Sequence, residues 1–435
     1  MLAMRFVATK LKALPTDWWA ILLAVILAGL YWSDLQTVPF HPDESTQIFM
    51  SGDVDLFFHD PSGLAWSPAK SGDPRQLYRL LDAPLTRWMI GIGREFTGQP
   101  ALLVDWNWSQ SWAENASAGA LPGSGLLQAS RLSVAWLFPF SLFLVYMVGI
   151  KISGVRTGFI ALILLATNAL VLLHTRRAMA ESGLLFATVL ALYSMMNFQK
   201  KAWLNAIPAA LAFAAKQTGA ILVIASLIVI FYEGLKYRKS DTFKNIALFA
   251  VIFLVITILL NPFLWSDPFR AIQAGLNARQ DLLQRQVAEF GEAIPGQVFQ
   301  SIPERSLGLV ANLFFTPLQF AETGNYLAQT QPAQEIYLSN PLQTILRSLP
   351  GGAISLFLAL AGLVLAFRPA GNDPANIRKN LSILLLNSIL VAGTIILAFP
   401  LSFQRYAIPM VPIAILWIAC GIDGVIRLIS MRTRK

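Results

Sequence analysis

The stretch WWAILLAVILAGLYW, residues 18–32, ends a few residues before HPDE, residues 41–44. An apolar run followed so soon by two carboxylates places Asp43 and Glu44 at a membrane face. Charge this close to hydrocarbon is costly, and acidic residues in such a position generally mark a functional site. Pro42 and Asp43 are also ordinary turn residues, so a solvated turn is the second interpretation of this stretch.

The composition indicates a protein that resides in a membrane. Hydrophobic residues make up 55% of the 435 residues and charged residues only 13%, and the mean hydropathy is +0.57. These values exclude a soluble globular protein and predict a multi-pass membrane protein. The single cysteine, Cys420, lies in an apolar run and excludes a disulfide framework and a cysteine metal cluster. The net charge of +9 does not indicate a nucleic-acid partner, because the cations follow the membrane topology.

The apolar runs predict the helices. Basic residues precede the first run as in a secretory signal, but residues 33–36 offer no small-residue cleavage pattern, so we expect an uncleaved first helix at residues 17–33. Further runs of spanning length lie at residues 132–150, 157–174, 179–198, 203–215, 218–235, 245–264, 350–367, 380–399 and 407–426. The predicted fold class is therefore an all-α integral membrane bundle of about ten transmembrane helices.

Lysine and arginine residues predict the orientation, because short cytoplasmic loops retain them. With the N-terminus in the cytoplasm, ten of the twelve lysines fall on the cytoplasmic side. The basic residues assigned to that side are Arg5, Lys10, Lys12, Lys151, Arg156, Lys200, Lys201, Lys236, Arg238, Lys239, Lys244, Arg368, Arg378, Lys379, Arg427, Arg432, Arg434 and Lys435. We therefore expect both termini in the cytoplasm, the last at the end of a tail comprising residues 429–435.

Two segments stay outside the membrane and are too long to be simple connectors, residues 34–130 and residues 265–349. The first carries the acidic motif and, at residues 82–95, a short amphipathic stretch that we expect to lie along the membrane surface. The second carries a polar helical pattern at residues 273–290, which predicts another helix over the outer face. The single membrane domain, residues 1–435, then has its transmembrane helices within residues 17–33, 131–264 and 350–428.

Ionisable side chains gather at helix ends on this outer side. They are Arg131 at the start of the second span, His174, Arg176, Arg177 and Glu181 around the next outer turn, Lys216 in the following one, and Arg405 with Tyr406 in the last. Each cation alone is typical of a side chain that anchors a helix at the interface. Their convergence on the face that carries Asp43 and Glu44 predicts a site for an anionic ligand at the outer leaflet.

Seven short motifs follow one another along almost the whole chain. They are Asp43-Glu44, Ala83-Pro84-Leu85, Arg131-Leu132, Arg177-Ala178-Met179-Ala180-Glu181, Lys216, Asn261-Pro262-Phe263-Leu264-Trp265 and Arg405-Tyr406-Ala407-Ile408-Pro409. In order, sidedness and spacing they resemble the C-type glycosyltransferases, in particular the protein mannosyltransferases and aminoarabinose transferases that use polyprenyl-phosphate sugars. Two features depart from the family. Ala83 replaces the first of two prolines, and no segment beyond the second outer loop is long enough for an acceptor-binding domain, which leaves the acceptor open.

The resemblance implies a membrane glycosyltransferase that moves a sugar, with inversion, from a polyprenyl-phosphate donor to a hydroxyl of a protein, lipid or glycan. It implies an active site on the extracytoplasmic side of a bacterial plasma membrane. Asp43 is implied as the catalytic base, and Glu44 as the residue that orients the acceptor or a bound cation. The candidates for the donor phosphate are Arg131, Arg177, Lys216 and Arg405, with His41, His174, Glu181 and Tyr406 in support. The chemistry agrees, because such a transfer needs a base, cations for the departing phosphate and an apolar groove for the isoprenoid.

Alternatives remain for several of these residues. Glu181 could neutralise Arg177, four positions earlier on the same helical face. The candidate ligands for a divalent metal are His41, His59 and His174 with Asp43 or Glu44, although their spacing is not that of metal ligands. The tryptophans that suit either interfacial anchoring or sugar stacking are Trp106, Trp108 and Trp112. At the level of function, a transporter or flippase for an anionic lipid or solute and a noncatalytic assembly subunit are the rival classes.

The lysine distribution makes a testable prediction about topology. A reporter fused after Lys239 should be cytoplasmic and one fused after Gln297 external, because only this orientation retains the lysines inside. Alkaline phosphatase and green fluorescent protein fusions measure this directly. The reverse result at either position would remove the argument that the acidic motif lies on the outer face.

Overall fold

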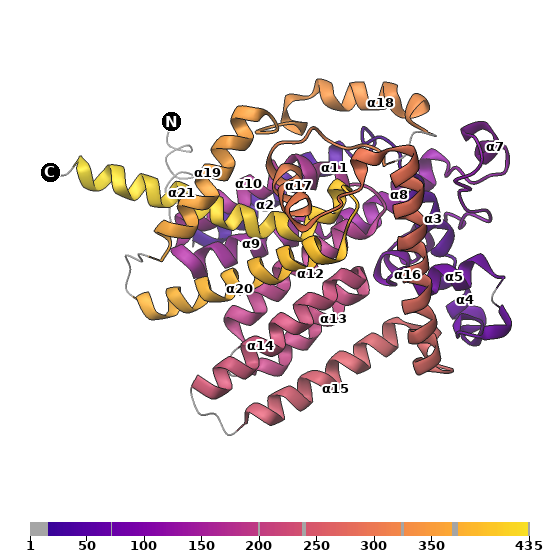
Figure 1. Ribbon diagram of the computed structural model, residues 1–435, viewed down its shortest axis with the longest axis horizontal. Helices are drawn as coiled ribbons and strands as arrows, with labels where there is room; N and C mark the ends of the chain where they lie inside the picture. Colours follow the sequence, from indigo (N-terminus) through magenta and orange to yellow (C-terminus); the bar gives the residue numbers. More distant parts are fainter. Residues whose placement is uncertain are drawn as a thin grey trace, which may run out of the picture.

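The apolar runs of the sequence fold as helices in the computed structural model (Figure 1), which describes residues 16–70, 72–198, 201–236, 241–322, 326–367 and 373–433. The apolar helices are α2 (Thr16–Ser33), α8 (Ser124–Ala135), α9 (Phe138–Ser153), α10 (Val155–Ala166), α11 (Ala169–His174), α12 (Ala180–Asn197), α13 (Ala206–Ala215), α14 (Ala220–Lys236), α15 (Thr242–Leu260), α19 (Leu349–Leu365), α20 (Pro374–Ala398) and α21 (Val411–Arg432). Within the described residues there is no strand, only an isolated bridge between Val298 and Leu401. The all-α fold class is confirmed.

The two outer segments also fold as helices. The first holds α3 (Pro42–Met50), α4 (Asp53–His59), α5 (Pro74–Leu81), α6 (Leu85–Thr97) and α7 (Trp112–Ser117), and the second holds α16 (Pro268–Ala293), α17 (Ile302–Phe314) and α18 (Leu327–Ser339). The 3-10 helices are η1 (Pro61–Leu64), η2 (Pro68–Lys70), η3 (Ala202–Asn205), η4 (Gln217–Gly219), η5 (Pro262–Leu264), η6 (Pro295–Gln297), η7 (Pro341–Gln343) and η8 (Gln404–Met410). Helices α6 and α16 occupy the two stretches for which the sequence predicted helical structure, and α16 crosses the ends of the apolar helices (Figure 1). Their position along a membrane surface stays a prediction.

By length and composition alone, fewer helices qualify as membrane spans than the ten that the sequence predicted. Among the described residues, six stretches are long and apolar enough to cross a membrane: Thr16–Ser33, Ser124–Ser153, Gln217–Lys236, Thr242–Leu260, Pro374–Ala398 and Gln404–Met431. Shorter apolar helices occupy Val155–Ala166, Ala202–Ala215 and Leu349–Leu365. The predicted run 157–174 is divided because Asn168 accepts hydrogen bonds from the backbone N–H groups of Leu170 and Val171 and so begins α11 as a separate helix.

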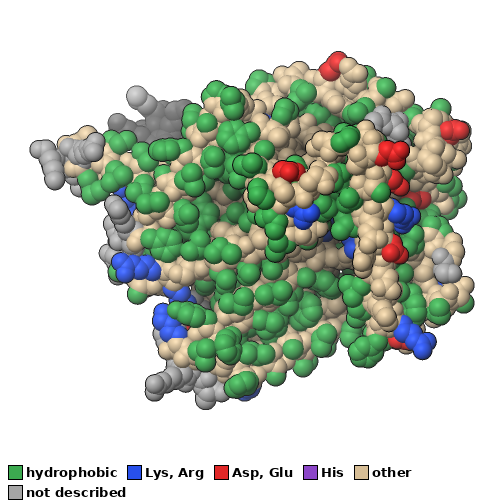
Figure 2. Space-filling view, in the orientation of Figure 1, with side chains coloured by type: hydrophobic (Ala, Val, Ile, Leu, Met, Phe, Trp, Pro, Cys, Tyr) green, Lys and Arg blue, Asp and Glu red, His purple; other side chains and the backbone are tan. Residues whose placement is uncertain are grey.

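The structure describes only some of the lysine and arginine residues from which the orientation was predicted. Arg5, Lys10, Lys12, Lys200, Arg238, Lys239, Arg368, Arg434 and Lys435 lie outside the described residues. On the face drawn in Figure 2, hydrophobic side chains cover the middle of the molecule, over α13 to α15 and α20, whereas acidic side chains gather at the right, over α16. This separation fits an apolar band with a charged outer end, and the orientation itself stays a prediction.

Helices α19 and α21 approach each other through glycine. A Cβ built on Gly362 would lie 1.9 Å from the carbonyl oxygen of Trp417, and one on Gly421 would lie 2.0 Å from that of Leu358. Because lipid-embedded helices lack a hydrophobic driving force between them, such close backbone contact is a main source of their association. The pair α19 and α21 therefore requires the absence of a side chain at both positions.

Adding one methyl group at this crossing should destabilise the bundle. Gly421→Ala is expected to lower stability by about 1–3 kcal/mol, because the backbone of α19 must move away from the new Cβ. Gly393→Ala in α20 is the matched control, since nothing lies within 4 Å of a Cβ there. Melting temperatures in detergent measure both variants, and equal values would contradict the close crossing.

Candidate active site

The motif HPDE begins helix α3 and thereby separates its two carboxylates. His41 is the N-cap residue, and its ring Nδ1 accepts a hydrogen bond of 3.1 Å from the backbone N–H of Asp43. The side chain of Glu44 reaches back to accept from the backbone N–H of His41, also at 3.1 Å, and Pro42 occupies the first turn. This is a reciprocal capping box with histidine in place of serine or threonine. It contradicts the solvated-turn interpretation, because His41 and Glu44 are both fully buried.

Glu44 and Arg131 form a buried ion pair. The carboxylate of Glu44 accepts hydrogen bonds of 2.8 Å from both Nε and Nη2 of Arg131 and one of 2.9 Å from the backbone N–H of Ala178. Arg131 gives its remaining Nη1 donors to the carbonyls of Leu35 and Val38. Burial alone would raise the pKa of Glu44, but the charge and hydrogen bonds of Arg131 outweigh it and hold that pKa below its usual range.

This pairing does not support two of the predicted roles. Arg131, expected at the donor phosphate, is 2% exposed and hydrogen-bonds inside the protein through Nε, Nη1 and Nη2. It lies within α8, which begins at Ser124 rather than at Arg131. Glu44, expected to orient the acceptor or a cation, has no carboxylate edge left for a ligand. Both residues hold the outer segment against the bundle.

The basic turn after α11 is also buried. Arg177 is 1% exposed and donates to the carbonyls of Pro39 and Phe320. Neither ring nitrogen of His174 has a hydrogen-bond partner among the described residues. Glu181 forms an ion pair of 2.7 Å with Lys216, so the predicted alternative of a Glu181 pair with Arg177 is wrong. The structure therefore assigns Arg177 to the joint between the two outer segments.

Asp43 faces the other way, toward Arg405. Its carboxylate forms an ion pair with Nη1 of Arg405, and its side chain is 31% exposed against 15% for Arg405. The Nε of Arg405 lies 3.1 Å from Oε1 of Glu322, whose Oε2 lies 2.6 Å from Nε2 of His41. Burial alone would raise the pKa of Asp43, but the positive charge of Arg405, aided by His41, holds that pKa below its usual range. Asp43 is therefore an ionised, partly accessible carboxylate at neutral pH.

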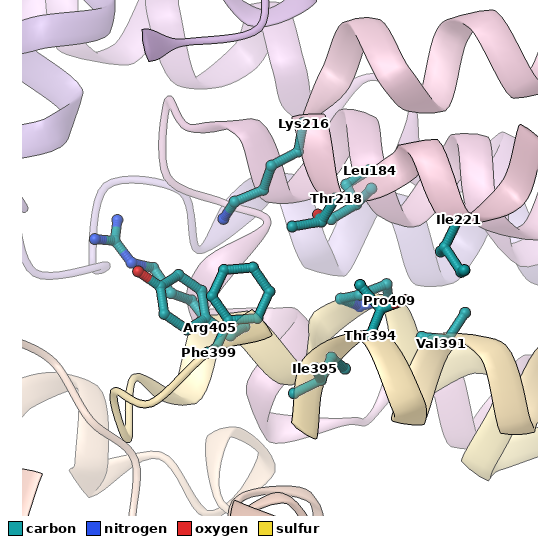
Figure 3. A pocket seen from close by; sticks show the side chains of 11 residues that line it. Leu184, Lys216, Thr218, Ile221, Val391, Thr394, Ile395, Phe399, Arg405 and Pro409 are labelled. Atoms are coloured by element: carbon teal, nitrogen blue, oxygen red, sulfur yellow. The ribbon is translucent and has the colours of Figure 1, made fainter. Parts of the chain in front are cut away.

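A groove leads away from this cluster between α12, α14, α20 and η8. Its cations, Lys216 and Arg405, lie at one end (Figure 3), where the Nζ of Lys216 lies over the ring of Tyr406. The apolar residues Leu184, Ile221, Val391, Ile395, Phe399 and Pro409 line it, with the two threonines Thr218 and Thr394. Figure 3 shows the side chains of Lys216 and Arg405 reaching toward the same end, with Ile221 and Val391 at the other. The geometry suits an amphiphile with an anionic head and an apolar tail.

Several polar residues near Asp43 escaped the sequence-based prediction. Glu322 is the main one, since it contacts both His41 and Arg405. Asp105 accepts hydrogen bonds from Tyr78 and Thr46, and burial raises its pKa above the usual range. Neither carboxylate lies in a motif or a periodic pattern, so only their spatial neighbours identify them. Of the three candidate tryptophans, Trp106 is buried among aromatic rings and is a packing residue.

The proposed metal ligands are not assembled. Both ring nitrogens of His41 are engaged, and His59 lies on α4, where its Nδ1 is 2.7 Å from the carbonyl of Asp55. Among the described residues, no three His, Cys, Asp or Glu side chains are placed to share an ion. Within the described part of the chain, the residues predicted for a divalent metal are therefore not brought together as one site.

Solved structures share this fold, although no protein-family model and no curated protein matches the sequence. The archaeal oligosaccharyltransferase AglB from Archaeoglobus fulgidus, in complex with an inhibitory peptide and a dolichol-phosphate, aligns with a TM-score of 0.51 at 14% identity over 96% of this chain and 51% of that chain. The Archaeoglobus fulgidus oligosaccharyltransferase in complex with Zn and sulfate aligns with a TM-score of 0.50 at 16% identity, over 94% and 50%. ArnT from Cupriavidus metallidurans bound to undecaprenyl phosphate gives a TM-score of 0.41 at 15% identity, over 95% and 78%.

The chain spans about half the length of the oligosaccharyltransferase structures that it matches. At these identities the likeness concerns the fold. The chain shares the fold of these oligosaccharyltransferase structures, which belong to the superfamily that the order of its motifs resembles.

The buried pair of Glu44 and Arg131 should matter for folding. Glu44→Gln is expected to lower stability by about 3–5 kcal/mol, because it leaves the charge of Arg131 buried without a partner. Glu292→Gln, at an exposed position on α16, is the matched control. Thermal unfolding in detergent measures both. Normal stability with lost turnover in Glu44→Gln would return Glu44 to a catalytic role.

Proposed function

We propose that the protein is a glycosyltransferase that transfers a sugar from a polyprenyl-phosphate donor to an acceptor hydroxyl on the extracytoplasmic side, with inversion at the anomeric carbon. The observation that carries the proposal is the continuity of three features: the apolar groove, the cations at its end, and the accessible carboxylate of Asp43 paired with one of those cations. The AglB structure of the same fold contains a dolichol-phosphate, which supports a lipid phosphate as the ligand class.

The groove matches the two parts of such a donor. Lys216 and Arg405 are the cations for the phosphate, because both line the groove and both are partly accessible, at 18% and 15%. The isoprenoid would extend along Ile221, Val391 and Ile395, where the gain comes from burying apolar surface. Tyr406 packs near Lys216, whose Nζ lies 5.3 Å from the ring centroid, and Glu181 holds Lys216 from the other side.

The reaction then needs one displacement. The acceptor oxygen bonds to the anomeric carbon while its proton passes to the carboxylate of Asp43. The bond between the anomeric carbon and the phosphate oxygen breaks, and its electron pair stays on the polyprenyl phosphate. Because that leaving group is an anion, fixed cations stabilise it without a strong general acid. Arg405 must exchange Asp43 for the donor phosphate before Asp43 can act as the base.

The remaining predicted residues take supporting roles in this proposal. His41 begins α3 and so places Asp43, while Arg131 and Arg177 join the outer segments to the bundle. No step depends on a metal. The lysine distribution supports cytoplasmic termini, and we assign the site to the outer face of a bacterial plasma membrane on the strength of the family resemblance.

Substitution of the base is the sharpest test. Asp43→Asn keeps the shape of the side chain but cannot accept a proton, so turnover should fall by about 10²–10⁴-fold. The measurement is transfer of radiolabelled sugar from a polyprenyl-phosphate donor by purified protein. Asp281→Asn, at an exposed position on α16, should transfer normally.

The same assay separates the rival functions. Movement of the labelled lipid across the bilayer of a proteoliposome without bond cleavage would indicate a flippase, and neither movement nor transfer a noncatalytic subunit. Near-normal transfer by Asp43→Asn would reject Asp43 as the base.

A further inference from the structure

Glu322 lies between the two halves of the site. It follows α17 in the second outer segment and is 6% exposed. One carboxylate oxygen lies 2.6 Å from Nε2 of His41, and the other lies 3.1 Å from Nε of Arg405. A nearly buried carboxylate with a partner on each oxygen is a fixed connector, because the loss of either partner leaves a buried carboxylate oxygen unsatisfied.

The hydrogen bonds of His41 define its tautomer. Its Nδ1 accepts from the backbone N–H of Asp43, so the ring proton lies on Nε2 and is donated to Glu322. Glu322 therefore fixes the imidazole ring of His41, the N-cap residue of α3. Asp43 lies in the first turn of that helix. Through its other oxygen the carboxylate of Glu322 forms an ion pair with the Nε of Arg405, whose Nη1 pairs with Asp43.

We propose that Glu322 is the positioning residue of this active site: it holds Arg405 by its Nε edge and α3 by His41, and so sets the distance between the donor phosphate and the base. The proposal rests on the proposed function. It explains how Arg405 can exchange partners, because the Nη edge passes from Asp43 to a phosphate while the Nε edge stays paired. Without Glu322 this exchange would leave a buried guanidinium unpaired at the moment when Asp43 departs.

Other charged and titratable groups also surround Asp43. They are His41, Tyr78, Asp82, Asp105, Tyr326, Glu322, Arg405 and Tyr406. Of these groups, all among the described residues, Glu322 is the one that contacts both His41 and Arg405. Only a carboxylate satisfies both, since an amide has a single acceptor oxygen and would present N–H to the second donor. A test must therefore compare an amide and a shorter carboxylate at the same position.

The experiment is a double-substitution cycle on the purified full chain, with kcat and donor KM measured for each variant. The variants are Glu322→Gln, Glu322→Asp, Arg405→Lys, the pair Glu322→Gln with Arg405→Lys, and the control Glu335→Gln, which removes an exposed carboxylate from the same outer segment. Lysine lacks the Nε edge of arginine, so Arg405→Lys removes the contact under test while keeping the charge.

Glu322→Gln should lower kcat by about 10- to 100-fold, because it leaves the guanidinium of Arg405 without this charged partner. Glu322→Asp should recover part of it, and Glu335→Gln should match the wild type. In the Arg405→Lys background, Glu322→Gln should add less than about threefold, because the two residues act as a unit. The proposal would be overturned if the fold-loss of kcat in the double variant equalled the product of the losses in the two single variants. Equal activity of Glu322→Gln and Glu335→Gln would also overturn it.

A second readout keeps this inference separate from the proposed reaction. The Kd for undecaprenyl phosphate is measured for the same variants by native mass spectrometry, with melting temperatures to verify folding. Glu322→Gln and Arg405→Lys should each weaken binding, and non-additively. If the wild type bound the lipid in this coupled way but transferred no sugar, the reaction would be rejected and the positioning role retained; additive changes in Kd, or no binding by the wild type, would reject the role. If Glu322→Gln did not fold, Glu322→Asp would complete both cycles.

Discussion

A fully buried carboxylate must be compensated where it lies, and Glu44 obtains its compensation from two distant parts of the chain and from the start of its own helix. Arg131 supplies two donors from α8, Ala178 supplies a backbone N–H before α12, and His41 supplies another at the start of α3. Removing one partner of a buried ion pair costs several kcal/mol, whereas replacing the whole pair by apolar residues often costs nothing. The main effect of the pair is therefore to specify one arrangement of the chain. In that arrangement the side chain of Asp43, the residue before Glu44, points outward to Arg405.

The fold could be predicted where the signal is local. Hydropathy over a window of residues depends on the segment itself, and all nine later apolar runs became helices or pairs of helices. The ends and breaks depend on single side chains. Asn168 divides a run that hydropathy treats as continuous, and α8 begins at Ser124, seven residues before the predicted start at Arg131, in a segment that is not apolar.

The sequence could predict on which face of the helix bundle the site lies, but not which residues form it. Helix-end position placed Arg131, Lys216 and Arg405 together, but sequence could not tell which of them was already saturated. Every guanidinium nitrogen of Arg131 hydrogen-bonds inside the protein, whereas Lys216 and Arg405 line a groove. That difference depends on carbonyls and carboxylates brought in from elsewhere. Glu322 shows the limit most clearly, because its partner His41 lies 281 positions away and nothing around it in sequence marks it.

The charges of the site are arranged for a reaction that moves negative charge without creating any. In the proposed transfer Asp43 loses its charge by taking the acceptor proton, and the phosphate gains one when the sugar leaves. The net charge of the site is unchanged, but one negative charge moves from the carboxylate to the phosphate. Arg405 is paired with Asp43 and also lines the groove, so it adjoins both ends of that shift. Once Arg405 has exchanged Asp43 for the donor phosphate, its charge interacts more strongly with that phosphate in the transition state than in the ground state, and this differential interaction is what lowers a barrier.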